Sequence, residues 1–553
     1  MMLDSLFSSF DPVKNPIGFG AADFVEIAIA LMLVALAIFW TPFVEPFARQ
    51  LSAKTRWAML ALAVAPVALR LALLAHHPVP TPDIYDEFGH LLVADTLRHF
   101  RLANPPHTLH QFFETFFVLQ TPTYGSIYPI GQGLILAIGR AVSGIPWVGV
   151  LIASAAFAPL CYWMLRAWTS PVWALAGGAL AVIEFGPLNQ WMNSYWGGML
   201  AATAGCLVFG ALPRLVEKFR TRDAFLLGAG LTIHLLTRPY ESIFLVAAAA
   251  LFLVPIWKRA MPVLLLGLLP GLAITLVHNK SATGQWTKLP YQLSQYQYGV
   301  PASLTFDADP VPHYELTPQQ QLEYKSQISF REGRETPGSY LLRLEYRVRY
   351  YRFFFLAPLY LAVPGFCFAA IRNRRYGWVL LTLAIFALGT NFFPAFQLHY
   401  LGAVTCLFIL MSVAGLEQIS RWSPEAARLL LFLCAAHFAF WYIAHLSGEG
   451  DVAVAMIRYE TWDNINHRNP ERRIAVKRQL DDIPGQLLVF VRYSPRHIFQ
   501  EEWVYNEASI DDARVIWARD LGEEENAKLR ALYPNRRVLL LEPDARAPKL
   551  SEY

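Results

Sequence analysis

Acidic side chains crowd one short stretch of the sequence, DIYDEFGH, which runs from Asp83 to His90. A carboxylate such as Asp86 or Glu87 can act as a general base toward a hydroxyl that lies within hydrogen-bond reach. The acids and the histidine could also hold Mg²⁺ or Mn²⁺, although their spacing matches no recognised metal motif. The pattern equally fits a helix start, with Asp83 or Asp86 as the cap and Glu87 in the first turn. We take Asp86 and Glu87 as the candidate catalytic pair, and leave Asp83 and His90 to capping or support.

The composition places this stretch in a membrane protein. The chain of 553 residues is 55% hydrophobic and only 16% charged, against about 25% charged in soluble proteins. Its net charge is +4, and the basic residues stand in short loops between apolar runs, which favours membrane orientation over nucleic-acid binding. All five cysteines lie inside apolar runs without metal spacing, so we expect them to be small core residues.

Apolar runs suggest an α-helical polytopic membrane protein. The expected spans are residues 24–43, 57–75, 147–166, 172–185, 197–216, 224–237, 242–257, 262–277, 353–371, 378–390, 398–415 and 429–445. Several are shorter than the roughly 20 residues that a span needs, so their ends are approximate. Residues 130–142 are apolar but short and contain Arg140, and we expect a helix at the outer interface there.

Lysines and arginines concentrate in every second connection, which the positive-inside rule assigns to the cytoplasm. With about twelve spans, both termini lie outside. The acidic stretch, the long loop 279–352 and the tail after Ser447 also lie outside. We therefore expect a transmembrane domain at 1–446, with its first outer loop at 76–146, and a small extracytoplasmic α/β domain at 447–553.

Two outer segments have their own character. The loop 279–352 is rich in tyrosine and punctuated by proline, which is typical of a lid or binding loop, although a plain spacer is the alternative. In the tail, residues 487–492, 514–518 and 537–541 are predicted strands and 523–532 a helix. We expect this domain to dock substrate or to stabilise the protein.

The segment after the acidic stretch carries a family resemblance. It reads ETFFVLQTPTYGSIYPIGQG from Glu114 to Gly133, an aromatic patch followed by Tyr-Pro and a glutamine flanked by glycines. Together, residues 83–139 resemble the first outer loop of C-type (GT-C) glycosyltransferases, which include protein O-mannosyltransferases and aminoarabinose transferases. Asp86-Glu87 match the acidic position of that loop. The extra span at 24–43 departs from the family pattern, in which the acidic loop usually follows the first span.

The resemblance implies transfer of a sugar from a polyprenyl-phosphate carrier to an acceptor at the outer face, with inversion. Asp86 or Glu87 would then serve as the base, and the phosphate leaving group would need positive charge. The outer candidates are Arg238, in TRPYE, Lys280, in HNK, and His399, in QLHY. Arg238 could instead pair with Glu241 at the surface, a contact of little energy, and Lys280 could extend from a helix end toward water.

Other residues could contact the substrate. They are Tyr128, Asn193, Glu241, Tyr291 and Tyr400. Asn193 lies in the WMNSYW segment, whose aromatics would by default form an interfacial belt.

The resemblance also implies partners and a location. The partners are the lipid-linked sugar, the bilayer and an acceptor of unknown class, with no nucleic acid. The location is a bacterial cytoplasmic membrane, with the site and the C-terminal domain facing the periplasm. No cofactor is required, although a divalent cation could participate. The alternatives are a lipid-linked polymer ligase, a transporter, or a non-catalytic envelope assembly protein.

Overall fold

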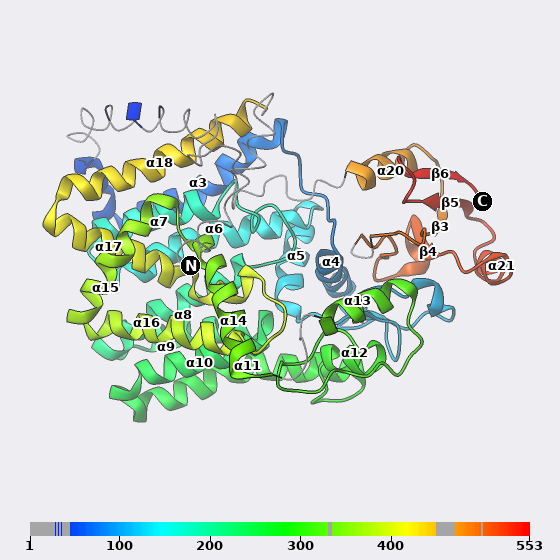
Figure 1. Ribbon diagram of the computed structural model, residues 1–553, viewed down its shortest axis with the longest axis horizontal. Helices are drawn as coiled ribbons and strands as arrows, with labels where there is room; N and C mark the ends of the chain where they lie inside the picture. The colour runs from blue at the N-terminus through cyan, green and yellow to red at the C-terminus, as the bar shows by residue number, and fades with distance from the viewer. Residues whose placement is uncertain are drawn as a thin grey trace.

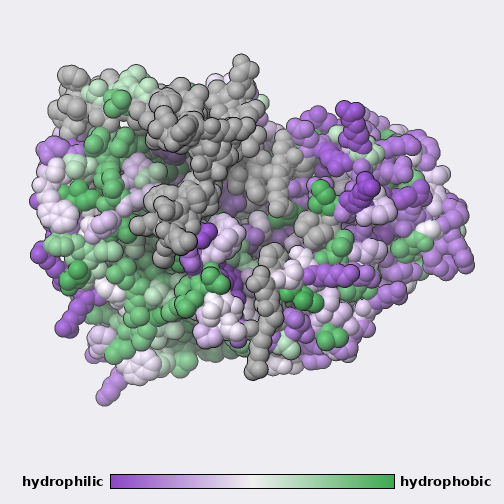
Figure 2. Space-filling model, viewed as in Figure 1, coloured by the Kyte–Doolittle hydropathy of each residue, from purple (hydrophilic) through white to green (hydrophobic). Residues whose placement is uncertain are grey.

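The computed structural model describes residues 28, 31, 32, 35, 45–329, 335–448, 471–498 and 501–553. The predicted span 24–43 therefore lies almost entirely outside the described residues. Apolar helices pack side by side over most of the molecule, and a small sheet lies at the opposite end from them (Figure 1). Figure 2 shows the same division, with hydrophobic residues over the bundle and hydrophilic residues over the sheet end.

The bundle helices follow the apolar runs of the sequence. They are α3 (Thr55–Ala72), α6 (Trp147–Leu165), α7 (Pro171–Phe185), α8 (Met199–Glu217), α9 (Thr221–Thr237), α10 (Pro239–Phe252), α11 (Trp257–Thr283), α15 (Ala362–Arg372), α16 (Arg374–Thr390), α17 (Thr405–Trp422) and α18 (Pro424–Leu446). Pro171 and Pro239 occupy the first positions of α7 and α10, where a missing N–H costs no helical hydrogen bond.

Six of the described apolar stretches are long enough to cross a membrane. They are Thr55–Ala75, Trp147–Leu165, Met199–Glu217, Val254–Thr283, Leu398–Trp422 and Pro424–Leu446. A bent pair, Pro337–Phe354 and Ala357–Arg372, would make a seventh if it formed one broken span. The protein is thus polytopic, but a count of about twelve is not shown, because helices such as α7 and α10 are shorter than the usual span of about 20 residues.

The predicted span 353–371 is not one straight helix. The chain bends by 114° between Pro337–Phe354 and Ala357–Arg372. Leu356 is extended there and Pro358 follows, so a straight helix cannot pass through this point.

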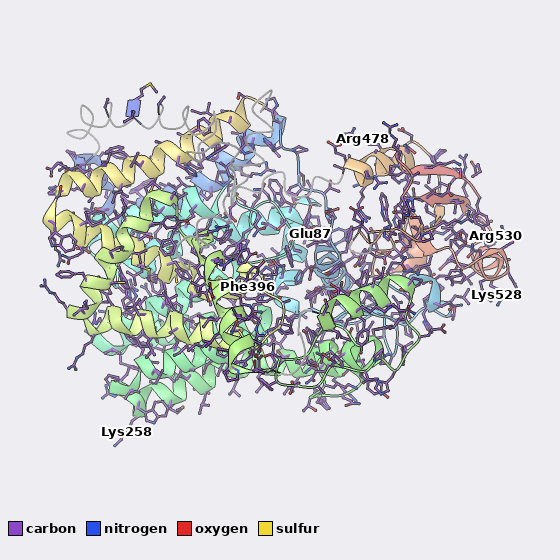
Figure 3. The ribbon with its side chains drawn as sticks, in the orientation of Figure 1. Glu87, Lys258, Phe396, Arg478, Lys528 and Arg530 are labelled. Carbon is purple, nitrogen blue, oxygen red and sulfur yellow. The ribbon has the colours of Figure 1, made fainter. Side chains whose placement is uncertain are left out.

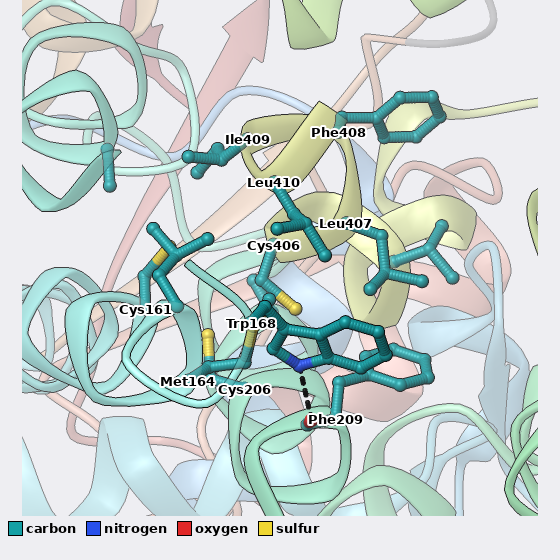
Figure 4. Packing of buried hydrophobic residues seen from close by; sticks show 14 of the residues in the cluster. Cys161, Met164, Trp168, Cys206, Phe209, Cys406, Leu407, Phe408, Ile409 and Leu410 are labelled. Carbon is teal, nitrogen blue, oxygen red and sulfur yellow. Dashed lines mark hydrogen bonds between the residues drawn. The ribbon is translucent and has the colours of Figure 1, made fainter. Parts of the chain in front are cut away.

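Small residues let the bundle pack closely. A side chain at Gly205 of α8 would meet the Ala403 carbonyl oxygen at 1.8 Å, and one at Gly415 of α17 would meet the Ala362 carbonyl oxygen at 2.0 Å. Backbones that approach this closely are typical of helices packed in membranes. In the core, Cys161, Cys206 and Cys406 lie beside Trp168, whose indole N–H donates to the Phe209 carbonyl at 2.9 Å (Figure 4). All five cysteines are free and four are buried, as expected, but Cys367 is exposed on α15.

The two segments that were predicted to lie outside, 76–146 and 279–352, contain several helices. The first outer loop holds α4 (Tyr85–Arg98), η2 (His110–Phe113), the short strands β1 (Val118–Leu119) and β2 (Gly125–Ser126), and α5 (Ile130–Ser143). The described part of the loop 279–352 holds α12 (Pro290–Tyr298), α13 (Pro318–Ser329) and α14 (Pro337–Val348), followed by η4 (Arg349–Phe354). The described part of that loop is therefore largely helical. Pro290, Pro318 and Pro337 each begin a helix, which is why the prolines there do not exclude helices.

The C-terminal segment forms a four-stranded sheet. Its elements are α20 (Glu471–Asp481), β3 (Leu487–Val491), β4 (Val515–Arg519), α21 (Glu523–Leu532), β5 (Arg537–Glu542) and β6 (Lys549–Glu552). The order is β4-β3-β5-β6; β3 runs parallel to β4 and β5, and β6 runs antiparallel to β5. The three predicted strands and the predicted helix are confirmed. The sheet shares a hydrophobic core with the first outer loop, in which Leu92, Phe112 and Phe113 contact Phe490 and its neighbours.

Candidate active site

The carboxylate of Glu87 accepts hydrogen bonds that hold the beginning of α4 in place. Only 6% of its surface is exposed, and three backbone N–H groups donate to its carboxylate. Asp83 at 2.9 Å and Ile84 at 3.4 Å donate to Oε2, and Tyr195 at 3.0 Å donates to Oε1. Burial raises the pKa of Glu87, and the three N–H groups oppose that change because they favour the ionised form. The cap position is Ile84, so the expectation that Asp83 or Asp86 caps the helix is wrong.

Asp86, the neighbouring acid, points toward other partners. Tyr128 donates its phenolic O–H to Oδ1 of Asp86. Burial and the nearby Asp86 carboxylate hold the pKa of Tyr128 well above its usual value, so Tyr128 remains a donor. His90, one turn further along α4, packs on Tyr128 with ring centroids 4.4 Å apart. Burial, with a smaller effect from Arg238, lowers the pKa of His90 to about 3, so its ring is neutral at physiological pH.

Arg238 lies at the junction of α9 and α10. It is both the C-cap residue of α9 and the N-cap residue of α10, directly before Pro239. Its guanidinium group lies 5.2 Å from the centre of the Tyr400 ring, in a cation–π contact. Its buried Nε has no hydrogen-bond partner among the described residues. Glu241, in the first turn of α10, is buried, so the alternative of a surface pair between Arg238 and Glu241 is wrong.

Tyr400 is the point where these segments meet. It lies in η6 (Leu398–Val404), and Arg238, Glu241, Asp86 and Arg347 all act on it electrostatically. The cluster therefore joins α4, the α9–α10 junction, η6 and α14. In Figure 3, Glu87 and Phe396 lie where the bundle meets the outer helices, whereas Lys258 lies at the far end of the bundle.

The long outer loop supplies Tyr291, Glu323 and Arg347 to this cluster. Tyr291 of α12 lies near Glu241 and Tyr400, and donates its hydroxyl to the Ala302 carbonyl at 3.2 Å. Glu323 of α13 is buried, and burial together with Asp86 raises its pKa. The inner face of α13 is polar, with Gln319, Gln320 and Glu323 all buried.

Arg347 of α14 was not predicted from the sequence. It is 2% exposed and donates to the carbonyls of Thr390, at 2.8 Å, and Pro394, at 2.7 Å. These bonds hold the turn that follows α16, while the charge lies close to Tyr400. The sequence carried one signal of a role for this segment. Residues 331–352 are rich in arginine, although the loop was predicted to lie outside, where the positive-inside rule expects few.

His399 lies beside the cluster. It is buried, packs against Trp196 with centroids 5.2 Å apart, and lies within electrostatic range of Arg238 and His90. The two tryptophans of the WMNSYW segment, Trp191 and Trp196, have different surroundings. Trp191 is buried and stacks on Phe185 with centroids 5.4 Å apart, so an interfacial belt is wrong for that residue.

Two predicted residues have other partners. The exposed Lys280 donates its ammonium group to the Gly284 carbonyl at 2.6 Å, at the end of α11. Asn193 accepts from Arg70 Nε at 2.6 Å and donates to the carbonyls of Pro187 and Asn189. Their substrate roles stay predictions.

Within the described residues, no three His, Cys, Asp or Glu side chains group as metal ligands. The role of a divalent cation stays open to test. The cluster offers a carboxylate that accepts from Tyr128, the half-buried Arg238, the buried Arg347, and tyrosines between them. A carboxylate and an anion site can thus act on one substrate.

The fold of the chain is the GT-C fold, as comparison with solved structures shows. ArnT from Cupriavidus metallidurans in the apo state matches with a TM-score of 0.51 at 11% identity, covering 88% of this chain and 93% of that chain. The same protein bound to undecaprenyl phosphate gives a TM-score of 0.47 at 11% identity, with the same coverage of 88% and 93%. The oligosaccharyltransferase of Archaeoglobus fulgidus in complex with zinc and sulfate gives 0.42 at 13% identity, covering 88% of this chain and 68% of that chain.

At these identities the likeness concerns the fold. It confirms the resemblance that residues 83–139 indicated. No protein-family model and no curated protein sequence matches the chain.

Proposed function

We propose that this protein is a membrane glycosyltransferase that moves a sugar from a polyprenyl-phosphate donor to an acceptor on the outer face, with inversion. The observation that supports it most is the convergence of Asp86, Tyr128, Arg238 and Tyr400 from separate segments. The fold shared with ArnT, an aminoarabinose transferase, agrees with this class of reaction. In this proposal residues 1–446 form the transferase domain, and 447–553 the outer α/β domain.

Asp86 is the proposed base. Its carboxylate takes the proton of the acceptor hydroxyl while that oxygen attacks the anomeric carbon of the donor sugar. The bond from the anomeric carbon to the phosphate oxygen breaks, and polyprenyl phosphate leaves with the bonding electrons. Attack opposite the leaving group inverts the anomeric centre. Tyr128 cannot remove this proton itself, since it donates to Asp86 and remains protonated.

Glu87 belongs in a supporting role. Each of its carboxylate oxygens already accepts from backbone N–H groups. Proton abstraction would require it to abandon those bonds inside the protein, where unpaired N–H groups are costly. Our prediction of a base shared by Asp86 and Glu87 therefore narrows to Asp86.

Arginines are the proposed phosphate partners. Charge builds on the phosphate oxygens as the sugar leaves, and a buried arginine stabilises that charge without rearranging. Arg238 has the geometry for this because its Nε is buried without a partner among the described residues. Arg347 adds a second positive charge near Tyr400, and the buried His399 lies beside them.

Sugar contacts are assigned to polar groups that face the same cluster. The candidates are Tyr128, Glu241, Tyr291 and Tyr400. Lys280 and Asn193 would have to leave their present partners to join them.

Transfer assays in proteoliposomes test this function. Purified protein is supplied with a panel of polyprenyl-phosphate sugars carrying a radiolabel, together with envelope extracts as acceptors. Asp86→Asn should reduce transfer by about 10²-fold or more, the usual loss for a positioned acid–base group. Glu315→Gln, a matched change of an exposed carboxylate in the outer loop, should leave transfer unchanged.

The outcomes separate the alternatives. If no donor in the panel is consumed but a lipid-linked polymer is joined to an acceptor, the protein is a ligase. If the wild type consumes neither, or if Asp86→Asn transfers sugar at the normal rate, the proposed mechanism is refuted.

A further inference from the structure

Helix α4 has two faces that contact different neighbours. Asp86 and His90 are four residues apart and point toward Tyr128 and the cluster around Tyr400. Phe88, Leu92 and Asp95 recur at intervals of four and three residues, which places them along one stripe of the helix. Phe88 follows Asp86 by two residues, or about 200° of rotation, so the stripe faces away from Asp86.

The stripe is held by the C-terminal segment at its beginning. Phe88 stacks on Tyr505 with ring centroids 4.4 Å apart and planes 8° from parallel. The guanidinium group of Arg473, in α20, lies 4.7 Å from the centre of the Phe88 ring and 4.5 Å from that of Trp503. Arg473 also donates to the Glu502 carbonyl at 2.5 Å, which fixes its direction.

The other end of the stripe is held by a hydrogen bond. Asp95 is buried, and its Oδ2 accepts from the backbone N–H of Ala508 at 2.8 Å. Its Oδ1 pairs with Arg140 of α5 at 3.0 Å and with Arg98 at 3.2 Å. Between the two ends, Leu92 enters the core that the sheet residues Leu488 and Phe490 share with the outer loop.

These contacts fix rotation as well as position. A hydrophobic contact alone lets a helix turn by small angles, because it has little direction. A planar stack at Phe88 and a directed hydrogen bond at Asp95, two turns apart, resist turning about the axis. A rotation of about 20° would move a carboxylate some 6 Å from the axis by about 2 Å, more than the 1 Å that can cost 10²-fold in rate.

We propose that the C-terminal segment sets the rotation of α4 and thereby aims Asp86, with Arg473 as a positioning residue. The segment then has a task beyond docking substrate or adding stability. The catalytic consequence rests on the proposed function, whereas the effect on α4 itself does not.

Three variants test the proposal. Arg473→Gln removes the charge and the planar fork, Arg473→Lys keeps the charge and part of the contact with the rings, and Arg478→Gln is the matched control. Arg478 is an exposed arginine on the same helix, and it lies at the outer side of the molecule in Figure 3.

Two measurements are made on each variant. In the transfer assay, Arg473→Gln should lower kcat by about tenfold to 10²-fold with donor KM within about twofold, because positioning acts on the chemical step. The acidic limb of the pH–rate profile should also move in Arg473→Gln. Arg473→Lys should recover part of the rate, and Arg478→Gln should match the wild type.

Hydrogen exchange gives a readout that needs no activity. Peptides covering Tyr85–Arg98 should exchange about tenfold faster in Arg473→Gln, while bundle helices such as α8 stay protected. Unchanged exchange in α4 overturns the proposal whether or not the protein transfers sugar. If α4 exchanges faster in Arg473→Gln but the wild type transfers no sugar, the control of α4 by the C-terminal segment is supported and the proposed function is refuted instead. If Arg473→Gln loses kcat together with protection from exchange throughout the protein, and its pH–rate profile does not shift, the proposal is also overturned.

Discussion

Asp86→Asn and Glu87→Gln should have opposite effects on stability and catalysis, although each only exchanges a carboxylate for an amide. Glu87→Gln places an NH₂ group on one side of a site whose three neighbours are all N–H donors. The better orientation keeps the amide oxygen on Asp83 and Ile84, and turns the NH₂ group toward the N–H of Tyr195.

The magnitude follows from the bonds that are lost. A hydrogen bond to a charged group contributes about 1.5–3 kcal/mol, and a buried donor left unpaired costs about 1–3 kcal/mol. Because the two overlap at the Tyr195 N–H, we expect Glu87→Gln to cost about 2–4 kcal/mol of stability. Asparagine at position 86 can still accept from Tyr128 through its amide oxygen, so Asp86→Asn should change stability by less than about 1 kcal/mol.

The assay pairs thermal unfolding in detergent with transfer per folded molecule. Glu87→Gln should unfold several degrees below the wild type, yet the molecules that remain folded should transfer sugar at a rate within about tenfold of normal. Asp86→Asn should unfold normally and should transfer sugar about 10²-fold more slowly or worse. A Glu87→Gln protein of normal stability that is inactive would make Glu87 the base and refute the assignment.

Three other changes test the surroundings of this pair. Arg238→Gln should lower kcat by about 10²-fold, the usual loss for a donor aimed at developing charge, and Arg238→Lys should recover part of it, with Arg101→Gln as an exposed control. His90→Asn should weaken the acid dependence of unfolding: the folded pKa of about 3 lies below the usual 6.5, so wild-type stability falls as the pH drops below 6.5, by up to about 1.4 kcal/mol per pH unit. A His90→Asn protein with the wild-type slope would contradict the assignment. Lys280→Ala should change donor KM by less than about fivefold, since exposed charges contribute about 1 kcal/mol or less, and a larger rise would restore the predicted phosphate role.

Much of the fold follows from local patterns. Long apolar runs located the bundle helices, and short apolar runs located three of the four C-terminal strands. Strand β6 was missed because KLSE carries no apolar alternation and depends on pairing with β5. α20 was missed because only Val476 and Leu480 of its eleven residues are buried, which leaves too weak a periodic signal.

The site was predictable where charge conflicted with its surroundings. Arg238 stood out as an outer arginine, and Asp86 as an acid beside a span. Arg347 and Glu323 could not be placed, because they come from a long loop whose path across the cluster depends on tertiary packing. The partners of Lys280 were hidden for the same reason, since its bond to Gly284 forms only where α11 ends.

The different roles proposed for Asp86 and Glu87 follow from their positions in the first turn of α4. Successive residues of a helix point about 100° apart, so neighbouring acids point in different directions. A glutamate three residues after the cap position can reach back to the free N–H groups there, as in a capping box. Once the cap is placed at Ile84, Glu87 occupies that position and Asp86 does not. In the proposed mechanism the acid pair is therefore one structural and one chemical residue, and the structural one is Glu87, whose carboxylate reaches back to the backbone N–H of Asp83.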